Sequence, residues 1–238
     1  MATIETQIAQ VANFMKVAGQ ETHTTPVGVS LGVANLRYNL ITEEISGKNE
    51  FAYCAARDDL VGMLDGMCDI LYVVYGAALT FGVDVLGEYT GLENRTAPSV
   101  INGTLARAND TLSTIQNLEY DVEQFKNGYS LGYYSTIVSA LSKIIENVFD
   151  YAELIQVDLA GAFEEVHKSN MSKFASTEEE AKNSIIARQL NGDDKYLNVY
   201  VAGVVVDGVE HWMIKRTEDH KILKCMSFFE PDLSKFVK

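Results

Sequence analysis

Apolar residues recur about every 3.6 positions through most of the chain, and this spacing predicts amphipathic helices. The first predicted helix covers residues 4–17 and the second covers residues 36–45, with a bend or end at Gly47. A third helix is predicted for residues 60–81, closing near Gly82. This third segment is apolar or small nearly all round, which is typical of a helix buried in a protein core.

Two further long helices are predicted between residues 86 and 154. One apolar stripe runs from Ile101 to Phe125 and the other from Ile137 to Tyr151, with Asn127-Gly128 as the turn between them. Helices joined by a short turn pack antiparallel. We interpret residues 86–154 as a helical hairpin inserted in a single domain of residues 1–238, because no Pro-rich or Ser-rich linker separates them from the rest.

The pattern changes near the C-terminus. A helix is predicted for residues 158–173, and the charged stretch 176–188 is either helical or loose. Residues 200–206 and 210–215 then alternate with a period of two around Asp207-Gly208, which is a strong β-hairpin signal. With a short third strand at residues 222–224, the sequence predicts a mainly α protein with a C-terminal β-hairpin extension over residues 196–238.

Composition narrows the range of partners and compartments. The chain of 238 residues has a formal net charge of -14, which argues against nucleic acid as a partner, because phosphate backbones are bound by clustered Lys and Arg. Cys54, Cys68 and Cys225 have no zinc-site spacing, and the N-terminus does not resemble a signal peptide. We therefore expect free thiols in a reducing compartment, the cytoplasm.

Residues 60–81 are long enough to cross a membrane, but Asp65 and Asp69 interrupt them. Each aspartate in mid-helix would cost about 2.5–3.5 kcal/mol on insertion. We therefore expect a buried helix of a soluble protein and no membrane partner.

The same two aspartates are the main candidates for chemistry. Four positions apart on a helix, Asp65 and Asp69 share one face. Buried carboxylates are costly unless they are paired or bind a metal. Packing this face against Glu43, Glu44 and Glu50 would create an oxygen-only cluster suited to Mg²⁺, with Mn²⁺ as the alternative. The competing interpretation is that the three glutamates are solvated and only the aspartate pair is special.

A second candidate feature is the polar, basic end of the helix predicted for residues 158–173. Lys168, Asn170 and Lys173 could bind phosphate there. Alternatively, the lysines merely complement the negative end of the helix dipole.

Four segments, in order, resemble the MazG-like superfamily of all-α nucleoside triphosphate (NTP) pyrophosphohydrolases. Residues 37–44 (RYNLITEE) are similar to its RxxLIxEE opening, and residues 65–78 (DGMCDILYVVYGAA) are similar to its DALGDILYVVYGTA segment. Residues 164–173 (EEVHKSNMSK) and 215–224 (KRTEDHKILK) resemble the branch related to phosphoribosyl-ATP pyrophosphohydrolase. The segment from about residue 86 to 154 lies outside the resemblance.

The resemblance implies a helical bundle that hydrolyses a nucleoside triphosphate, with Mg²⁺, to the monophosphate and pyrophosphate. It implies catalytic and metal-binding roles for Glu43, Glu44 and Asp69, with Glu50 and Asp65 as further ligands. The residues that it implies for substrate binding are Arg37, Tyr72, Lys168, Asn170, Lys173, Lys221 and Lys224.

Three positions depart from the family pattern. The third acid of the EExxE motif falls on Gly47, where Glu50 would replace it after a small insertion. The ExxD glutamate falls on Gly66, which leaves Asp65 as its substitute, and Gly62 stands where some relatives have Glu. The alternatives are hydrolysis of another phosphorylated nucleotide, such as phosphoribosyl-ATP, and a non-catalytic nucleotide-binding or regulatory protein.

A homo-oligomer, a dimer or a tetramer, is also expected. The stripes of the inserted hairpin must be buried either on the chain's own core or against another subunit. We expect the inserted helices to lie at or near the subunit contact.

Overall fold

The computed structural model describes residues 3–87, 106 and 108–237, and the structural statements below concern these residues. The chain divides into two compact units. The first comprises Met1–Ala12, Thr22–Val166 and Asp232–Lys238, and the second comprises Asn13–Glu21 and His167–Pro231. Helices α1 (Ile4–Val17) and α7 (Leu159–Met171) contribute residues to both units, and each unit is described by itself.

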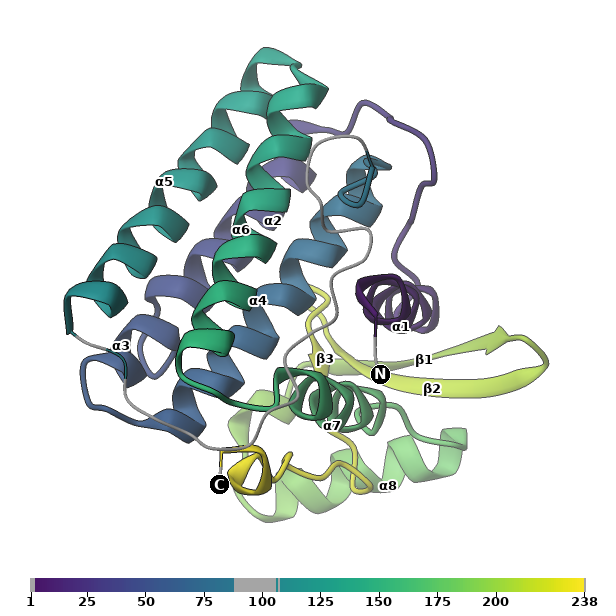
Figure 1. Ribbon diagram of the computed structural model, residues 1–238. Coiled ribbons are helices and arrows are strands. Elements are labelled where there is room, and N and C mark those ends of the chain that lie inside the picture. Colours follow the sequence, from purple (N-terminus) through teal and green to yellow (C-terminus); the bar gives the residue numbers. More distant parts are fainter. Residues whose placement is uncertain (1–2, 88–105, 107, 238) are drawn as a thin grey trace. The chain divides into compact units, whose positions relative to one another are not determined.

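The first unit is built around four long helices (Figure 1). They are α2 (Leu31–Ser46), α4 (Leu60–Phe81), α5 (Ala108–Leu131) and α6 (Tyr134–Leu154). Helix α2 packs on α4, α5 packs on α2 and α6, and α6 packs on α4. The short helix α3 (Phe51–Ala55) lies against α4 and α2. The mainly α bundle predicted from the apolar spacing is confirmed.

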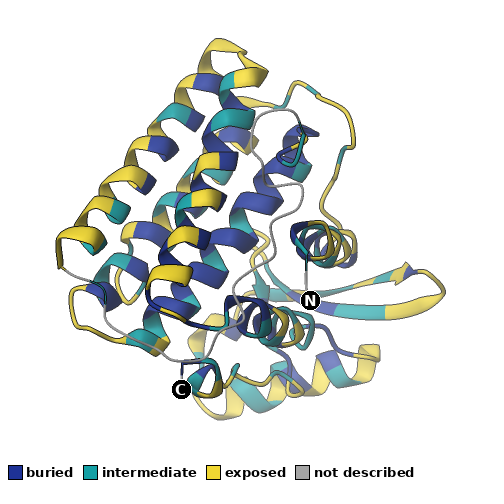
Figure 2. Cartoon of the chain, in the orientation of Figure 1, coloured by how far each residue is buried: buried dark blue, intermediate teal, exposed yellow. Residues whose placement is uncertain are grey.

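Helix α4 is the central element of this bundle, and most of its residues are buried (Figure 2). It begins at the N-cap Asp59, whose carboxylate accepts a hydrogen bond from Gly62 N at 3.0 Å. It ends at Gly82, whose left-handed φ of 64° suits a residue without a Cβ. Among the described helices, α4 alone has the length and hydropathy of a membrane span, but 67% of that window is buried inside the protein. It is therefore the core helix of a folded bundle, as its two aspartates indicate.

Most of the described apolar residues of the inserted hairpin are buried within their own chain. Leu118, Val122 and Phe125 of α5 and Ile137 and Ile144 of α6 are each no more than 3% exposed. They belong to helices that pack on α2 and α4, so the hairpin completes the bundle instead of standing apart from it. Leu112 of the α5 stripe is nevertheless 53% exposed, so the burial of this stripe is not continuous. Ile101 and Leu105, which begin the stripe, lie outside the described residues.

The turn of this hairpin is not at Asn127-Gly128, and that prediction was wrong. Helix α5 continues to Leu131, and the chain reverses at Gly132, which has a φ of 73°. Gly128 serves packing instead, because a Cβ there would lie 2.9 Å from the backbone nitrogen of Ile137 on α6. A glycine that permits a close helix–helix approach has the same local sequence signal as one that makes a turn.

The second unit contains a three-stranded antiparallel sheet in the order β1-β2-β3. Strands β1 (Val199–Val206) and β2 (Val209–Arg216) form the predicted hairpin, and β3 (Ile222–Leu223) pairs with β2. Residues 176–188, for which the sequence predicts either a helix or a loose segment, are largely helix α8 (Glu178–Leu190). Two short 3₁₀ turns, Asp194–Tyr196 in this unit and Ser234–Phe236 in the first, complete the described elements.

Both faces of the hairpin are packed by residues of the same unit. Val199 and Val201 pack against a cluster that contains Ala181 of α8 and Ile214. Ala202 and Val204 pack against a second cluster, whose members are Val17, Ala18, Phe174, Val206 and Met213. The sheet is thus a thin layer with apolar contacts on either side.

Candidate functional site: a carboxylate cluster on three helices

Three acidic side chains of the first unit converge on one point. Glu44 comes from α2, Glu50 is the N-cap residue of α3, and Asp69 comes from α4. One carboxylate oxygen from each lies within 4.8 Å of the other two, and all three residues are partly buried. The sequence predicted that the aspartate face of the third helix would meet the glutamates of the second, and these three residues do meet.

The end of α2 explains how Glu50 enters the cluster. Gly47 is the C-cap, where the chain leaves the helix, and Asn49 turns it with a φ of 71°. A Cβ on Gly47 would lie 2.4 Å from the carbonyl oxygen of Glu43 and 3.0 Å from Cγ of Glu50. Position 47 therefore has no room for a side chain, and the acid that the family pattern places there arrives three residues later.

Gly66 has a matching explanation on α4. A Cβ there would lie 2.8–2.9 Å from the backbone nitrogen, Cα and Cβ of Phe51. The first turn of α3 thus lies directly on α4 at this glycine. Because α3 carries Glu50 at its start, the close approach that forbids a glutamate at position 66 also brings another glutamate to the cluster.

The electrostatics of the cluster are those of crowded acids. Burial raises the pKa of Glu44 to about 8, and the charges of Asp69, Glu50, Glu43 and Asp65 add to the shift. The pKa of Glu50 is also raised, by burial first and then by Asp65 and Glu43, while a hydrogen bond with Glu44 opposes the rise. Without a cation, the cluster holds a proton near neutral pH that isolated glutamates would have lost.

The remaining predicted residues of the first unit lie around this centre. Asp65 and Glu43 act on Glu44 and Glu50 through their charges, although Glu43 is exposed. Arg37 lies two turns before Glu44 on α2, and burial lowers its pKa to about 10. Tyr72, three residues after Asp69, is 8% exposed and stacks on Phe163 with ring centroids 5.7 Å apart.

The second unit carries the predicted phosphate-binding residues. Lys173 Nζ donates to Oδ1 of Asn170 at 2.6 Å, so this amine and this amide form a pair at the end of α7. Ser169 and Ser172, which separate the candidates, have structural contacts: Ser169 Oγ donates to the carbonyl of Phe229 at 2.8 Å. Ser172 Oγ accepts from the backbone nitrogen of Phe229 at 3.2 Å. The motif therefore combines two serines that anchor the segment around Phe229 with the Asn170–Lys173 pair.

The two other predicted lysines differ from each other. Lys224 forms an ion pair with Glu230 at 2.6 Å and lies 4.1 Å from the ring centroid of Phe228. Lys221 is exposed, and its backbone nitrogen donates to Asp219. Of these two side chains, Lys224 would first have to exchange the carboxylate of Glu230 for a phosphate.

One residue near the cluster was not among the candidates. Cys54 lies on α3, and a Cβ on Gly62 would be 2.5 Å from its sulfur. Burial raises the pKa of the Cys54 thiol, and the charges of Asp59, Glu50 and Asp65 raise it further. The thiol therefore occupies the space beside Gly62, where some relatives have Glu. Nothing in the spacing of the cysteines pointed to this contact.

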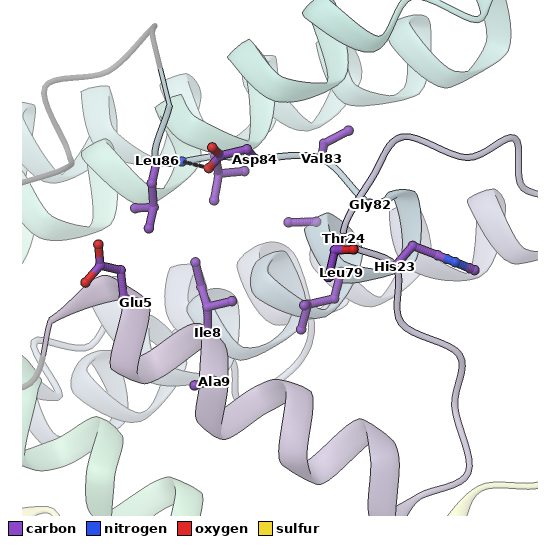
Figure 3. Close-up of a pocket in the computed structure, with 12 residues that line it drawn as sticks. Glu5, Ile8, Ala9, His23, Thr24, Leu79, Gly82, Val83, Asp84 and Leu86 are labelled. Atoms are coloured by element: carbon purple, nitrogen blue, oxygen red, sulfur yellow. Dashed lines mark hydrogen bonds between the residues drawn. The ribbon is translucent and has the colours of Figure 1, made fainter.

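A separate cavity of about 340 Å³ lies at the other end of α4 (Figure 3). Its lining is mainly apolar and includes Ile8, Leu79 and Leu86, with Asp84 hydrogen-bonded to the backbone nitrogen of Leu86 at 2.8 Å. Leu79 follows Asp69 by ten positions, which is about 15 Å along a helix. The cavity is therefore not part of the carboxylate cluster.

The first unit is thus a helical bundle in which acids from three helices converge on one point. Residues 11–95 match the phosphoribosyl-ATP pyrophosphohydrolase family. Over this segment the chain is similar to that family, which is part of the MazG-like all-α NTP pyrophosphohydrolase superfamily, and the resemblance seen in the sequence is confirmed there. The match contains Glu44, Glu50 and Asp69.

The chain is also similar to uncharacterized protein L479 of Acanthamoeba polyphaga mimivirus. The two are 29% identical over 209 residues, which cover 84% of this chain and 81% of the relative. The similarity therefore extends beyond the family segment. No solved structure matches the chain.

Proposed function

We propose that the protein is a metal-dependent nucleoside triphosphate pyrophosphohydrolase, which converts an NTP or dNTP and water to the monophosphate and pyrophosphate. The observation that carries this proposal is the convergence of Glu44, Glu50 and Asp69 in a segment of the pyrophosphohydrolase family. The family match of residues 11–95 by itself supports a hydrolase of the pyrophosphohydrolase type.

The cluster fits a hard divalent cation. Its donors are carboxylate oxygens only, which suit Mg²⁺ or Mn²⁺. The pKa of Glu44 is raised first by burial and then by repulsion from the neighbouring acids, and a cation would relieve this repulsion. Glu44, Glu50 and Asp69 would hold the ion, with Glu43 and Asp65 completing the acidic surroundings. Such an ion supplies charge stabilisation to a phosphoryl oxygen and an acidified water.

The other candidate residues would act on the substrate. We assign phosphate binding to Lys168, Asn170, Lys173, Lys221 and Lys224, because amines and amides are suitable donors to phosphate oxygens. Arg37 would add a fixed positive charge on the face of α2 that carries Glu44. Tyr72 would support the nucleotide through its ring, which stacking on Phe163 holds in place.

The direct test is pyrophosphate release from a panel of NTPs, dNTPs and phosphoribosyl-ATP with Mg²⁺ or Mn²⁺. Release from at least one triphosphate, abolished by EDTA, would support the proposal. Turnover of phosphoribosyl-ATP alone would instead favour the second enzymatic function, and binding without turnover would indicate a regulatory protein. The cytoplasm remains our proposal for the compartment.

Metal and pH should act together on stability. The folded-state pKa of Glu44, about 8, lies above the ordinary value of 4.5, so the folded chain binds more protons between these pH values. The free energy of unfolding of the metal-free protein should therefore fall as the pH rises from about 5 to 8. Mg²⁺ or Mn²⁺ at about 100 times its Kd should add about 2.7 kcal/mol at the upper pH.

Urea denaturation in EDTA, repeated with metal at both pH values, measures this coupling. Glu44→Gln should flatten the pH dependence and reduce the gain from metal. An identical stability with EDTA and with metal at pH 8 would contradict a preformed cation site.

Glu50 should behave as a ligand and not as a surface acid. We expect Glu50→Gln to raise the metal concentration needed for half-maximal activity at least tenfold, because one of three converging carboxylates becomes neutral. Glu119→Gln, on α5, is the matched control and should leave this concentration unchanged. Wild-type metal dependence in Glu50→Gln would mean that nothing replaces the acid missing at Gly47.

A further inference from the structure

Strand β1 is an edge strand with one side unpaired. The sheet order is β1-β2-β3, so among the described strands β1 pairs with β2 alone. Its eight residues pair with β2 without interruption, from Val199↔Arg216 to Val206↔Val209. The side of β1 away from β2 therefore offers a regular row of backbone groups.

The hairpin turn identifies which residues form that row. Asp207 and Gly208 have φ values of 51° and 81°, the conformation of a two-residue type I′ turn. In such a hairpin the closing pair, Val206 and Val209, exchanges both hydrogen bonds, and bonded residues then alternate along the strand. The residues whose N–H and C=O groups point outward are Val199, Val201, Gly203 and Val205.

These outward groups are accessible and unprotected. In the described part of the chain, none of the four residues makes a backbone hydrogen bond outside the hairpin. Gly203 is exposed, and without a side chain its exposed surface is backbone; Val205 is 64% exposed. Native edge strands are usually guarded by a charge, a proline or a bulge, and β1 has none of these.

We propose that β1 is the contact of a homodimer, in which it pairs antiparallel with β1 of a second copy to make one continuous six-stranded sheet. The strand is self-complementary in this arrangement. In one register, Val199 of each copy lies opposite Val205 of the other, and Val201 lies opposite Gly203. This register places Ala202 on the twofold axis. Antiparallel pairing about a twofold axis is an isologous contact, the commonest kind in homo-oligomers.

Charge does not oppose a second copy at this strand, although it does over most of the surface. The chain carries a net charge of -14, so most of its surface repels another copy of itself. Strand β1 (VYVAGVVV) has no charged residue, and in the proposed register no like charges are opposed. Because both faces of the hairpin are already packed by its own unit, the edge is the part left for a partner. This inference does not depend on the proposed enzymatic function.

The first test compares two substitutions at Val205. Val205→Pro removes an outward N–H but no hydrogen bond of the hairpin, whereas Val205→Thr keeps the N–H and the branched side chain. Light scattering at micromolar concentration should give twice the chain mass of 26.3 kDa for the wild type and for Val205→Thr. Val205→Pro should give the mass of one chain with its circular dichroism unchanged. A monomeric wild type, or a Val205→Pro variant that is folded and still dimeric, would overturn the proposal.

The second test examines the register and remains informative if Val205→Pro does not fold. Opposed residues that are not hydrogen-bonded have Cα atoms about 4.5 Å apart, which suits a disulfide. Mild oxidation should therefore cross-link Ala202→Cys to a covalent dimer. Glu210→Cys, on β2 and away from the axis, should remain a monomer on a denaturing gel. Failure of Ala202→Cys to cross-link, or equal cross-linking of both variants, would exclude the contact at β1.

Discussion

Replacing Asp69 by Asn should abolish pyrophosphate release and leave a folded protein. Asn keeps the shape of the side chain but removes one of three converging carboxylates, so the cation loses a charged ligand. If the ion contributes about 4 kcal/mol of charge stabilisation to the reaction, its loss lowers kcat by about 10³-fold. The metal-free variant should be at least as stable as the wild type, because Asp69 raises the pKa of Glu44 by charge repulsion.

Three measurements separate this result from simple unfolding. Circular dichroism and urea denaturation in EDTA establish that Asp69→Asn is folded, and calorimetry with Mn²⁺ measures the loss of the ion. Asp110→Asn is the matched control, because Asp110 is exposed in the first turn of α5. Turnover at the wild-type rate in Asp69→Asn would show that Asp69 is not an active-site residue and that the carboxylate cluster does not take part in the reaction.

The sequence predicted most of the helices because their apolar faces are buried as the spacing requires. Residues 4–17 and 60–81 form helices with the predicted ends, and Asp207-Gly208 makes the predicted hairpin turn. The turn at Asn127-Gly128 was wrong, since the local signal does not reveal that Ile137 on α6 approaches Gly128. A contact distant in sequence decided the role of that glycine.

The sequence predicted which kind of side chain forms the candidate site, but not how the helices bring these side chains together. The spacing of Asp65 and Asp69 and the nearby glutamates were sufficient to predict a carboxylate cluster. The centre of the cluster consists of Glu44, Glu50 and Asp69 because α3 begins next to Glu50. The position of α3 depends in turn on its packing against Gly66, which is a tertiary contact. Gly66 is the position where α3 contacts α4, and Gly47 lies against the carbonyl of Glu43 and the side chain of Glu50. Only the structure could show that these two departures from the family motifs are close contacts.

Restoring the family's acid at position 66 should therefore damage the protein. Any Cβ there meets the backbone of Phe51 at 2.8–2.9 Å, so α3 must move away from α4 and take Glu50 with it. We expect Gly66→Ala to lower the free energy of unfolding by about 1–3 kcal/mol through overpacking. Gly66→Glu should cost more, because it also buries a charge beside existing acids. Activity should fall in both variants in parallel with the affinity for metal.

Gly32→Ala is the matched control for these substitutions. Gly32 is exposed near the start of α2, and its nearest neighbour to an added Cβ is Oγ of Ser30 at 3.9 Å, an ordinary contact. The same change there should stabilise the helix by about 0.5 kcal/mol, because alanine loses less backbone entropy than glycine on folding. Urea denaturation of the three variants, with Mn²⁺ titrations, measures both effects. A gain of activity or of metal affinity in Gly66→Glu would show that α3 is not fixed against α4, and that Glu50 reaches the cluster without the contact between Phe51 and Gly66.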